Sequence, residues 1–163
     1  MKLANIVFLI KRGTDSEITE VLMAMKKRGF GEGKWNGVGG KVKVDEETVE
    51  EAAIREAEEE IGVKIAPQNL KKAAEMHFSF EDKGDWETEA HAFIVEKWEN
   101  DPVETEEMAP RWFPIREIPF DAMWSGDDIW IPQVLAGKAL KGDFVFTKDD
   151  QIKVAKMEFV EGL

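Results

Sequence analysis

The sequence has no cysteine, no long apolar run and no low-complexity segment or internal repeat. The absence of cysteine excludes disulfides, thiolate zinc sites and cysteine nucleophiles together. No apolar run approaches the roughly 20 residues that a membrane helix needs, so we predict no membrane partner. The opening stretch MKLANIVFLIKRG has a short apolar centre followed at once by Lys11 and Arg12. This pattern favours a first strand over a secretory signal, and predicts a cytoplasmic protein.

Negative charge, in contrast, is abundant. The net charge is -12, while 43% of the 163 residues are hydrophobic and 34% are charged. That length and composition predict one globular domain, residues 1–163, with its own core. An acidic surface repels nucleic-acid polymers, whose binding depends on neutralising phosphates. A small anionic substrate remains compatible with this charge if a metal cation mediates its binding.

Hydrophobic patterning predicts strands before, between and after two helices. The first two strands are expected at 4–10 and 18–25, followed by a loop with six glycines between Gly29 and Gly40. A helix is expected from Thr48 to Gly62, where Thr48 and Glu51 form a capping box. A second helix is expected at 127–137, with Asp127 or Asp128 as its cap and Gly137 as its end. Further strands are expected at 73–81, 87–98, 111–115, 143–147 and 151–160. Together they predict an α/β sandwich around a mixed sheet.

The first helix carries an unusual stretch, REAEEEIGV at 55–63. On a helical wheel Glu56, Glu59 and Glu60 share one wedge with Arg55, beside an apolar face, while Glu58 points elsewhere. Like charges three and four residues apart repel, so a solvated acidic face leaves this repulsion unrelieved. A hard divalent cation relieves it, because Mg²⁺ takes oxygen ligands and also binds substrate phosphates. A solvated face and a metal site therefore both remain open.

The same stretch resembles the signature of the Nudix hydrolases, G-x5-E-x7-R-E-U-x-E-E-x-G-U, from Glu47 onward. Gly40 lies one residue further from Glu47 than in that pattern. The resemblance implies a Nudix fold and hydrolysis of a nucleoside diphosphate linked to another group, with Mg²⁺ or Mn²⁺. It implies that Glu56, Glu59, Glu60 and the carbonyl of Gly39 or Gly40 bind the metal. Glu59 would also orient or deprotonate water, and Glu47 would pair with Arg55.

Flanking residues are similar to the MutT-homologue branch of this family in animals, which hydrolyses oxidised purine nucleoside triphosphates such as 8-oxo-dGTP. The resemblance implies that Glu107 is a further metal ligand or the alternative base. It also implies substrate-binding roles for Asn5, Lys26, Phe30, Asn36, Gly39, Gly40, Phe78, Phe80, Met108 and Trp124. Other interpretations remain: core packing for Phe78, Phe80 and Met108, a turn role for Asn36, and a solvated patch for Lys26.

The stretch MWSGDDIW departs from that branch, in which two adjacent acids read the oxidised base. If Trp130 anchors the comparison, Gly126 stands at the first acid position and only Asp127 matches. If the loop is shifted by one residue, Asp127 and Asp128 both serve. A protonated buried carboxyl beside an ionised one is suited to reading a purine edge.

Three hypotheses follow from these patterns. The first is a diphosphatase that converts oxidised purine nucleoside triphosphates to the monophosphate and pyrophosphate, and so protects DNA from damaged precursors. The second is a Nudix enzyme for another substrate, such as 2-hydroxy-dATP, an unmodified triphosphate, a dinucleotide or a nucleotide sugar. The third is a non-enzymatic nucleotide or metal sensor. No motif implies a protein partner.

Overall fold

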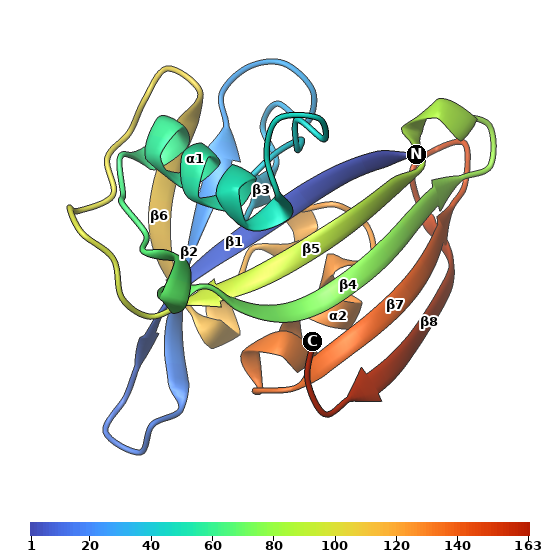
Figure 1. The fold of residues 1–163 in the computed structure, drawn as a ribbon. Helices are drawn as coiled ribbons and strands as arrows, with labels where there is room; N and C mark the ends of the chain where they lie inside the picture. Colours follow the sequence, from blue (N-terminus) through green and yellow to red (C-terminus); the bar gives the residue numbers. More distant parts are fainter.

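A computed structural model describes residues 1–163 as eight strands, two α-helices and four short 3-10 helices (Figure 1). The strands are β1 (Lys2–Arg12), β2 (Ile18–Lys26), β3 (Trp35–Asn36), β4 (Lys71–Phe80), β5 (Thr88–Val95), β6 (Met108–Pro114), β7 (Ala139–Phe146) and β8 (Ile152–Val160). The helices are α1 (Val49–Ile61) and α2 (Asp127–Leu135), with 3-10 helices η1 (Pro67–Asn69), η2 (Gly84–Trp86), η3 (Ile115–Glu117) and η4 (Phe120–Ala122). Neither α-helix is long and apolar enough to cross a membrane.

The strands form a mixed sheet in the order β3-β2-β1-β5-β4-β7-β8, and β6 also pairs with β2. Two pairs, β1 with β5 and β4 with β7, are parallel, and the remaining pairs are antiparallel. The predicted mixed sheet with helices is therefore confirmed. The sequence prediction missed the short strand β3, and it placed the start of β6 three residues too late.

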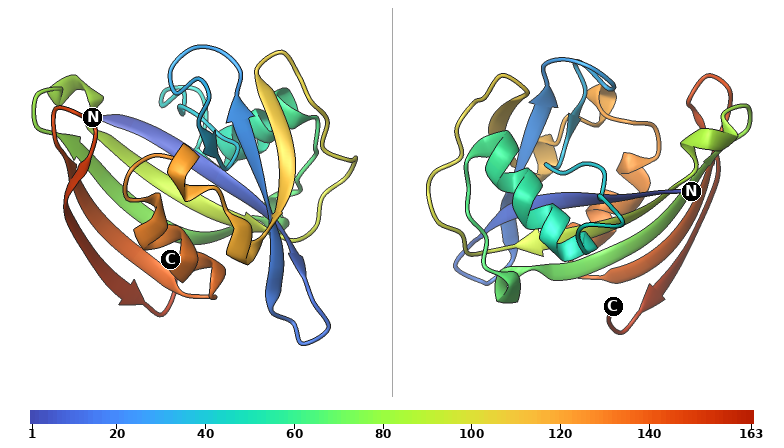
Figure 2. Two further views of the ribbon diagram at one scale, coloured as in Figure 1. Left: turned by 180° about the vertical axis from the view of Figure 1, so that it is seen from behind. Right: turned by 45° about the horizontal axis from the view of Figure 1, so that its top comes forward.

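Strand β1 lies at the centre and is buried on both faces. Because side chains alternate along a strand, Phe8 and Ile10 join one core while Val7 and Leu9 join the other. Helix α2 packs into the first core and α1 into the second. The two helices accordingly cover opposite faces of the sheet, which is visible when the molecule is seen from in front and from behind (Figures 1 and 2).

Helix α1 has the termini that its sequence predicts. The Thr48 side chain accepts a hydrogen bond from the Glu51 N–H, and the Glu51 carboxylate accepts one from the Thr48 N–H. At the other end Gly62 adopts a left-handed conformation with φ of 73°, and its N–H donates to the Glu58 carbonyl. This ending favours glycine, because a Cβ strains left-handed backbone. The local signals thus fix the helix that carries the acidic residues.

Helix α2 begins differently from its prediction. Its N-cap is Gly126, with φ of 94°, and neither Asp127 nor Asp128 caps it with a side chain. The Asp127 carboxylate instead accepts a hydrogen bond from Trp130 Nε1 at 3.1 Å. The prediction that an aspartate caps this helix is wrong, because Trp130 of the same helix takes the Asp127 side chain. The other end agrees with its prediction, since Gly137 follows the C-cap Ala136 in a left-handed conformation with φ of 92°.

Candidate active site

A cavity of about 690 Å³ opens between the glycine-rich loop, α1, the β4–β5 region and the start of α2. It brings together most of the residues predicted to bind metal or substrate. These are Asn5, Lys26, Phe30, Asn36, Gly39, Gly40, Glu56, Glu60, Phe78, Phe80, Glu107, Met108, Trp124 and Asp127. Four predicted residues, Glu47, Arg55, Glu59 and Asp128, do not line the cavity. One end of the cavity is acidic and the other is aromatic.

The glycine-rich loop crosses the acidic end closely enough to require glycine. Gly39 has φ of 143°, and a Cβ there would lie 2.6 Å from the Asn5 side-chain oxygen. A Cβ on Gly40 would lie 3.0 Å from a Glu56 carboxylate oxygen. The Gly39 N–H donates to Glu60 Oε2 at 3.1 Å. The loop backbone therefore packs directly on the carboxylates of α1, as the glycines predicted.

Arg55 organises the carboxylates from outside the cavity. Its guanidinium binds both oxygens of Glu47, at 2.9 and 2.7 Å. Its Nη1 also lies 3.2 Å from Glu56 Oε1 and 3.0 Å from Glu59 Oε2. The hydrogen bond from Arg55 lowers the pKa of Glu47 to about 2. The structure thus contains the Glu47–Arg55 pair that the sequence predicts, with two further glutamates on the same arginine.

Glu60 is the most buried carboxyl group of the cluster, with an exposed fraction of 3%. Burial raises its pKa to about 8, although the Gly39 N–H acts in the opposite direction, and the charge of Glu56 raises the pKa further. Two carboxylates that are close together and poorly hydrated are costly unless a cation or a proton neutralises them. A bound cation, or a proton, would therefore lower the cost of burying Glu60 beside Glu56.

The donor groups at this end suit a hard divalent cation, although they are not gathered into a complete site. No three acidic or histidine side chains lie at metal-binding spacing. Glu59 is 57% exposed and faces Arg55, while Glu107 is 52% exposed and lies 3.9 Å from Arg28. Glu56 and Glu60 line the cavity and supply carboxylate oxygens, the ligands that Mg²⁺ and Mn²⁺ prefer. The chemistry of the donors fits, and a side-chain rotation is needed to add Glu59.

The sequence left open whether the Gly39 or the Gly40 carbonyl is the metal ligand, and their hydrogen bonds differ. The Gly40 carbonyl oxygen accepts from the Asn5 backbone N–H at 2.9 Å and from Asn5 Nδ2 at 3.3 Å. No hydrogen bond is made to the Gly39 carbonyl oxygen. Gly39 therefore has the carbonyl that remains available as a ligand. Asn5 itself is buried, and its Oδ1 has no hydrogen-bond partner.

The other end of the cavity is aromatic. Phe78 packs against Phe144 and Phe146, with ring centroids 5.6 and 5.9 Å apart, and Phe80 stacks on Phe146 at 5.0 Å. Both Phe78 and Phe80 pack on the first core and also line the cavity, so core packing does not exclude the predicted substrate-binding role. Met108 is buried in the second core and also reaches the cavity. An apolar, flat-walled space of this kind accommodates a planar ring.

Asp127 is the acid at the aromatic end. It is 6% exposed, its Oδ1 accepts the Trp130 bond described above, and its Oδ2 has no partner. Burial raises the pKa of Asp127 to about 7. Asp128 is exposed and lies outside the cavity. The structure therefore brings one aspartate to the cavity and leaves its neighbour in solvent.

Asn36 makes a turn contact and also lines the cavity. Its Oδ1 accepts from the Gly37 N–H at 2.8 Å. Lys26 lies at the cavity and lowers the pKa of Glu60 by its charge. The substrate-binding roles of both residues stay predictions.

Sequence reasoning missed several residues that line the cavity: Lys2, Lys34, Lys41, Trp86 and Phe146. Lys34 Nζ lies 4.8 Å from the ring centroid of Trp124. Trp86 lies in the turn between β4 and β5, where only tertiary structure brings it to the site. An unexplained tryptophan in a short polar turn was the available signal for Trp86.

Comparison with known proteins agrees with this geometry. Residues 2–134 match the family model described as NUDIX domain. The chain is 42% identical over 163 residues to the oxidized purine nucleoside triphosphate hydrolase of Danio rerio, covering 99% of this chain and 97% of that protein. It is 44% identical over 133 residues to the protein of the same name from Mus musculus, covering 81% and 82% of the two chains.

Solved structures show the same fold at lower sequence identity. A MutT protein from Bacillus halodurans superimposes with a TM-score of 0.78 at 21% identity, over 97% of this chain and 98% of that one. A MutT NUDIX hydrolase from Burkholderia pseudomallei gives a TM-score of 0.59 at 24% identity, over 72% and 86%. With the match to residues 2–134 and the acidic helix beneath a glycine-rich loop, these similarities show that the chain belongs to the NUDIX family.

Proposed function

We propose that the chain hydrolyses oxidised purine nucleoside triphosphates such as 8-oxo-dGTP, with Mg²⁺ or Mn²⁺, to the monophosphate and pyrophosphate. The observation that carries this proposal is a cavity with carboxylates at one end and an aromatic space with an unpartnered buried acid at the other. The names of the two animal relatives support it. A cytoplasmic location follows, because nucleoside triphosphates form an intracellular pool.

The aromatic end is suited to the base. Phe78 and Trp124 offer ring surfaces, and Asp127 Oδ2 is the free hydrogen-bonding atom among them. With a pKa of about 7, the Asp127 carboxyl is partly protonated near neutral pH. A protonated carboxyl donates a hydrogen bond and an ionised one only accepts, so this group can distinguish purine edges that differ by one oxygen.

The acidic end is suited to the phosphates. A bound divalent cation would neutralise phosphate charge and lower the pKa of a bound water. Glu56, Glu60 and the Gly39 carbonyl would hold it, with Glu59 and Glu107 as further ligands. Arg55 fixes the carboxylates of Glu56 and Glu59 in direction, and Glu59 or Glu107 would accept the proton of the attacking water. Water would attack one phosphorus of the α–β anhydride as its proton passes to that base, and the bridging P–O bond would break to give the monophosphate and pyrophosphate.

Lysines at the cavity supply the remaining positive charge. In a chain with a net charge of -12, four lysines line this one cavity: Lys2, Lys26, Lys34 and Lys41. A local basic group inside an acidic surface attracts a triphosphate to the cavity. This arrangement supports a small anionic nucleotide as the partner of the cavity.

One observation favours a second candidate, a Nudix hydrolase for a different nucleoside diphosphate-linked substrate. Only Asp127 reaches the aromatic end, because Gly126 precedes it and Asp128 is exposed. A base-binding site with one acidic side chain forms fewer hydrogen bonds with the base than a site with two. The catalytic end is unaffected by this difference, whereas the choice of base is not.

Steady-state hydrolysis with Mg²⁺ on paired substrates tests the proposal. The pairs are 8-oxo-dGTP against dGTP and 2-hydroxy-dATP against dATP, with products identified. We expect pyrophosphate release and a kcat/KM at least about 10-fold higher for an oxidised base. A site that hydrogen-bonds a group of its substrate discriminates against an analogue without that group. Equal rates on oxidised and normal bases would move the assignment to the second candidate. Hydrolysis of none of the four would reject the proposal.

A further inference from the structure

Trp86 is a large aromatic residue at the cavity that the preceding assignments leave without a role. It ends η2, the short turn between β4 and β5, and its side chain is half-buried. It belongs to neither hydrophobic core. Its ring lines the cavity instead. Trp86 meets the first core through Phe80, whose ring lies 5.6 Å away at 80° and packs on that core. Its remaining contacts lie at the cavity and need a separate account.

The contacts of Trp86 connect two sides of the cavity. Its ring meets Phe30 edge-on, with centroids 5.0 Å apart and planes at 87°. Phe30 in turn stacks on Trp124, at 5.2 Å and 25°. These three rings, which we call the aromatic bridge, come from the glycine-rich loop, the β4–β5 turn and the segment before α2. Residues remote in sequence thus form one row of rings along the aromatic end.

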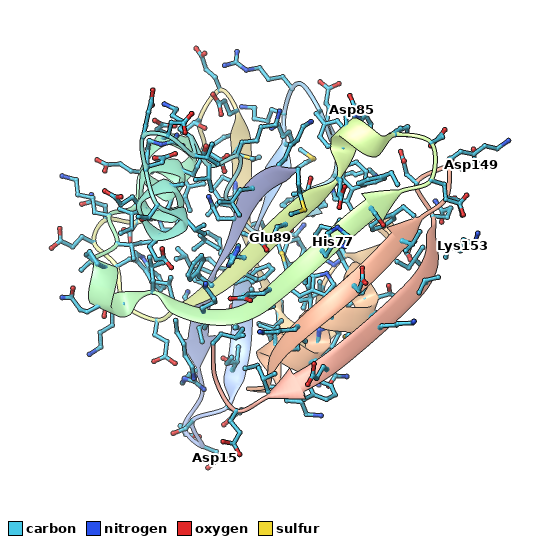
Figure 3. All side chains as sticks on the ribbon, turned by 45° about the vertical axis from the view of Figure 1, so that its right-hand side comes forward. Asp15, His77, Asp85, Glu89, Asp149 and Lys153 are labelled. Atoms are coloured by element: carbon cyan, nitrogen blue, oxygen red, sulfur yellow. The ribbon has the colours of Figure 1, made fainter.

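Trp86 and Phe30 lie on segments that differ in how firmly they are held. The turn with Trp86 is fixed to the β7–β8 turn by the Lys83–Asp150 ion pair at 2.8 Å, and Lys83 Nζ also lies 4.3 Å from the Trp86 ring. The neighbouring positions Asp85 and Asp149 mark these two turns side by side in Figure 3. Phe30, in contrast, is 63% exposed and lies between glycines of positive φ at 29 and 31.

We propose that Trp86 is a specificity-determining residue that, together with Phe30, closes the aromatic end over a bicyclic base and selects purines over pyrimidines. This inference rests on the proposed nucleotide substrate. Phe30 stacks on Trp124 at 5.2 Å, so it would shift to admit a base beside Trp124. A bicyclic ring there would extend toward Trp86, whereas a monocyclic ring would reach less far. Aromatic contact with a base stabilises binding in proportion to the overlap. Exposed Phe30 is then the ring that adjusts to the bound base.

Three variants test this role by steady-state kinetics: Trp86→Ala, Trp86→Phe and the control Trp98→Ala. Trp98 also loses an aromatic partner when truncated, since it stacks on Trp112 at 5.8 Å, but it does not line the cavity. We expect Trp86→Ala to raise KM for a purine triphosphate by about 5- to 20-fold, with kcat and KM for dCTP within about twofold of wild type. Trp86→Phe restores most of the loss, and Trp98→Ala leaves KM unchanged.

An unchanged purine KM in Trp86→Ala would overturn the inference. A structural role would also overturn the inference. Its signs would be that Trp86→Ala lowers kcat, the purine preference in KM and the melting temperature together, and that Trp86→Phe restores none of them.

Calorimetric binding of dGMP and dCMP without metal separates this inference from the proposed function. If wild type hydrolyses no purine triphosphate, the proposed function fails, and the binding data alone decide the role of Trp86. We expect tighter binding of dGMP than of dCMP in wild type and loss of that difference in Trp86→Ala. Equal binding of both by wild type, or an unchanged difference in the variant, would contradict the role.

Discussion

The two ends of the cavity are built in different ways. The acidic end comes mainly from one helix and the loop before it, so Glu56 and Glu60, with Glu47 and Arg55 outside the cavity, lie within 14 residues of one another. The aromatic end is assembled from β3, β4, the β4–β5 turn, the loop after β2 and the start of α2. A site formed by one local segment leaves its pattern in the sequence, whereas a site formed by many segments does not. We expect the first end to set the rate and the second to set the choice of base.

The largest expected effect is at the acidic end. Glu56→Gln keeps the shape of a side chain that lines the cavity and contacts Arg55, but removes its charge. We expect kcat to fall by about 100-fold or more at saturating Mg²⁺ on every substrate alike, because charge stabilisation of the phosphates is lost. The matched control is Glu58→Gln, an exposed residue of the same helix, which should keep wild-type kcat. Equal losses in both variants would refute the separation of the two helix faces.

The second effect is at the aromatic end. Asp127→Asn should reduce the kcat/KM ratio of 8-oxo-dGTP to dGTP by about 10-fold while kcat stays within about twofold, because the proposed role of this residue is to contact the base and not the phosphates. Asp128→Asn is the control, since Asp128 is exposed and outside the cavity. A larger change in the ratio from Asp128→Asn than from Asp127→Asn would show that the loop reads the base with the other aspartate.

The third effect is the pH dependence of base binding. Burial raises the pKa of Asp127 to about 7, so its carboxyl is mostly protonated below that pH and mostly ionised above it. A hydrogen bond donated by this carboxyl is therefore lost as pH rises. We expect KM for 8-oxo-dGTP to increase between about pH 6 and pH 8.5 in wild type, and to be flat in Asp127→Asn. The same pH slope in both proteins would assign the titration to another group.

The smallest effect lies outside both ends, on the outer face of the sheet, where Figure 3 shows His77 and Glu89 on neighbouring strands. The hydrogen bond to Glu87, and then that to Asp143, raise the pKa of His77 above its usual 6.5. A raised histidine pKa contributes stability that is present below about pH 6.5 and is lost as pH rises through the folded-state pKa. His77→Gln should therefore reduce the difference between the urea midpoints measured at pH 6 and pH 9.

Activity provides the control for the His77 variant. Because His77 does not line the cavity, kcat and the 8-oxo-dGTP to dGTP ratio should stay at wild-type values in His77→Gln at pH 7. A change in the 8-oxo-dGTP to dGTP ratio would indicate that the outer face is coupled to the aromatic end. It would argue against two separate functional regions.

The sequence was most informative where structure depends on short-range contacts. The capping box at Thr48, the left-handed Gly62 and the pairing of Glu47 with Arg55 all involve residues within eight positions, and each is present in the structure. The glycine-rich loop was also predicted, and at Gly39 and Gly40 its backbone approaches the carboxylates closely enough that a Cβ would clash. The catalytic roles of these residues stay predictions, whereas their geometry is now described.

The sequence was less informative where competing contacts decide. Asp127 or Asp128 was expected to cap α2, but the Asp127 carboxylate binds Trp130 of the same helix and the cap is Gly126. Trp86 and Lys34 reach the cavity through strand pairing and loop packing that no local pattern reports. The glutamates of α1 were expected to converge, yet Glu59 binds Arg55 and does not line the cavity. A partner distant in sequence, or a competing contact within the same helix, determines each of these side-chain positions.

The most direct test of the division into two ends is the affinity for the product 8-oxo-dGMP, measured calorimetrically with EDTA present, in wild type and in Glu56→Gln. If the aromatic end alone holds the base, the two proteins should bind 8-oxo-dGMP with Kd values within about twofold, and both should bind dGMP more weakly. Loss of 8-oxo-dGMP binding in Glu56→Gln, or equal binding of the two monophosphates by wild type, would contradict the claim that base recognition and catalysis are separate.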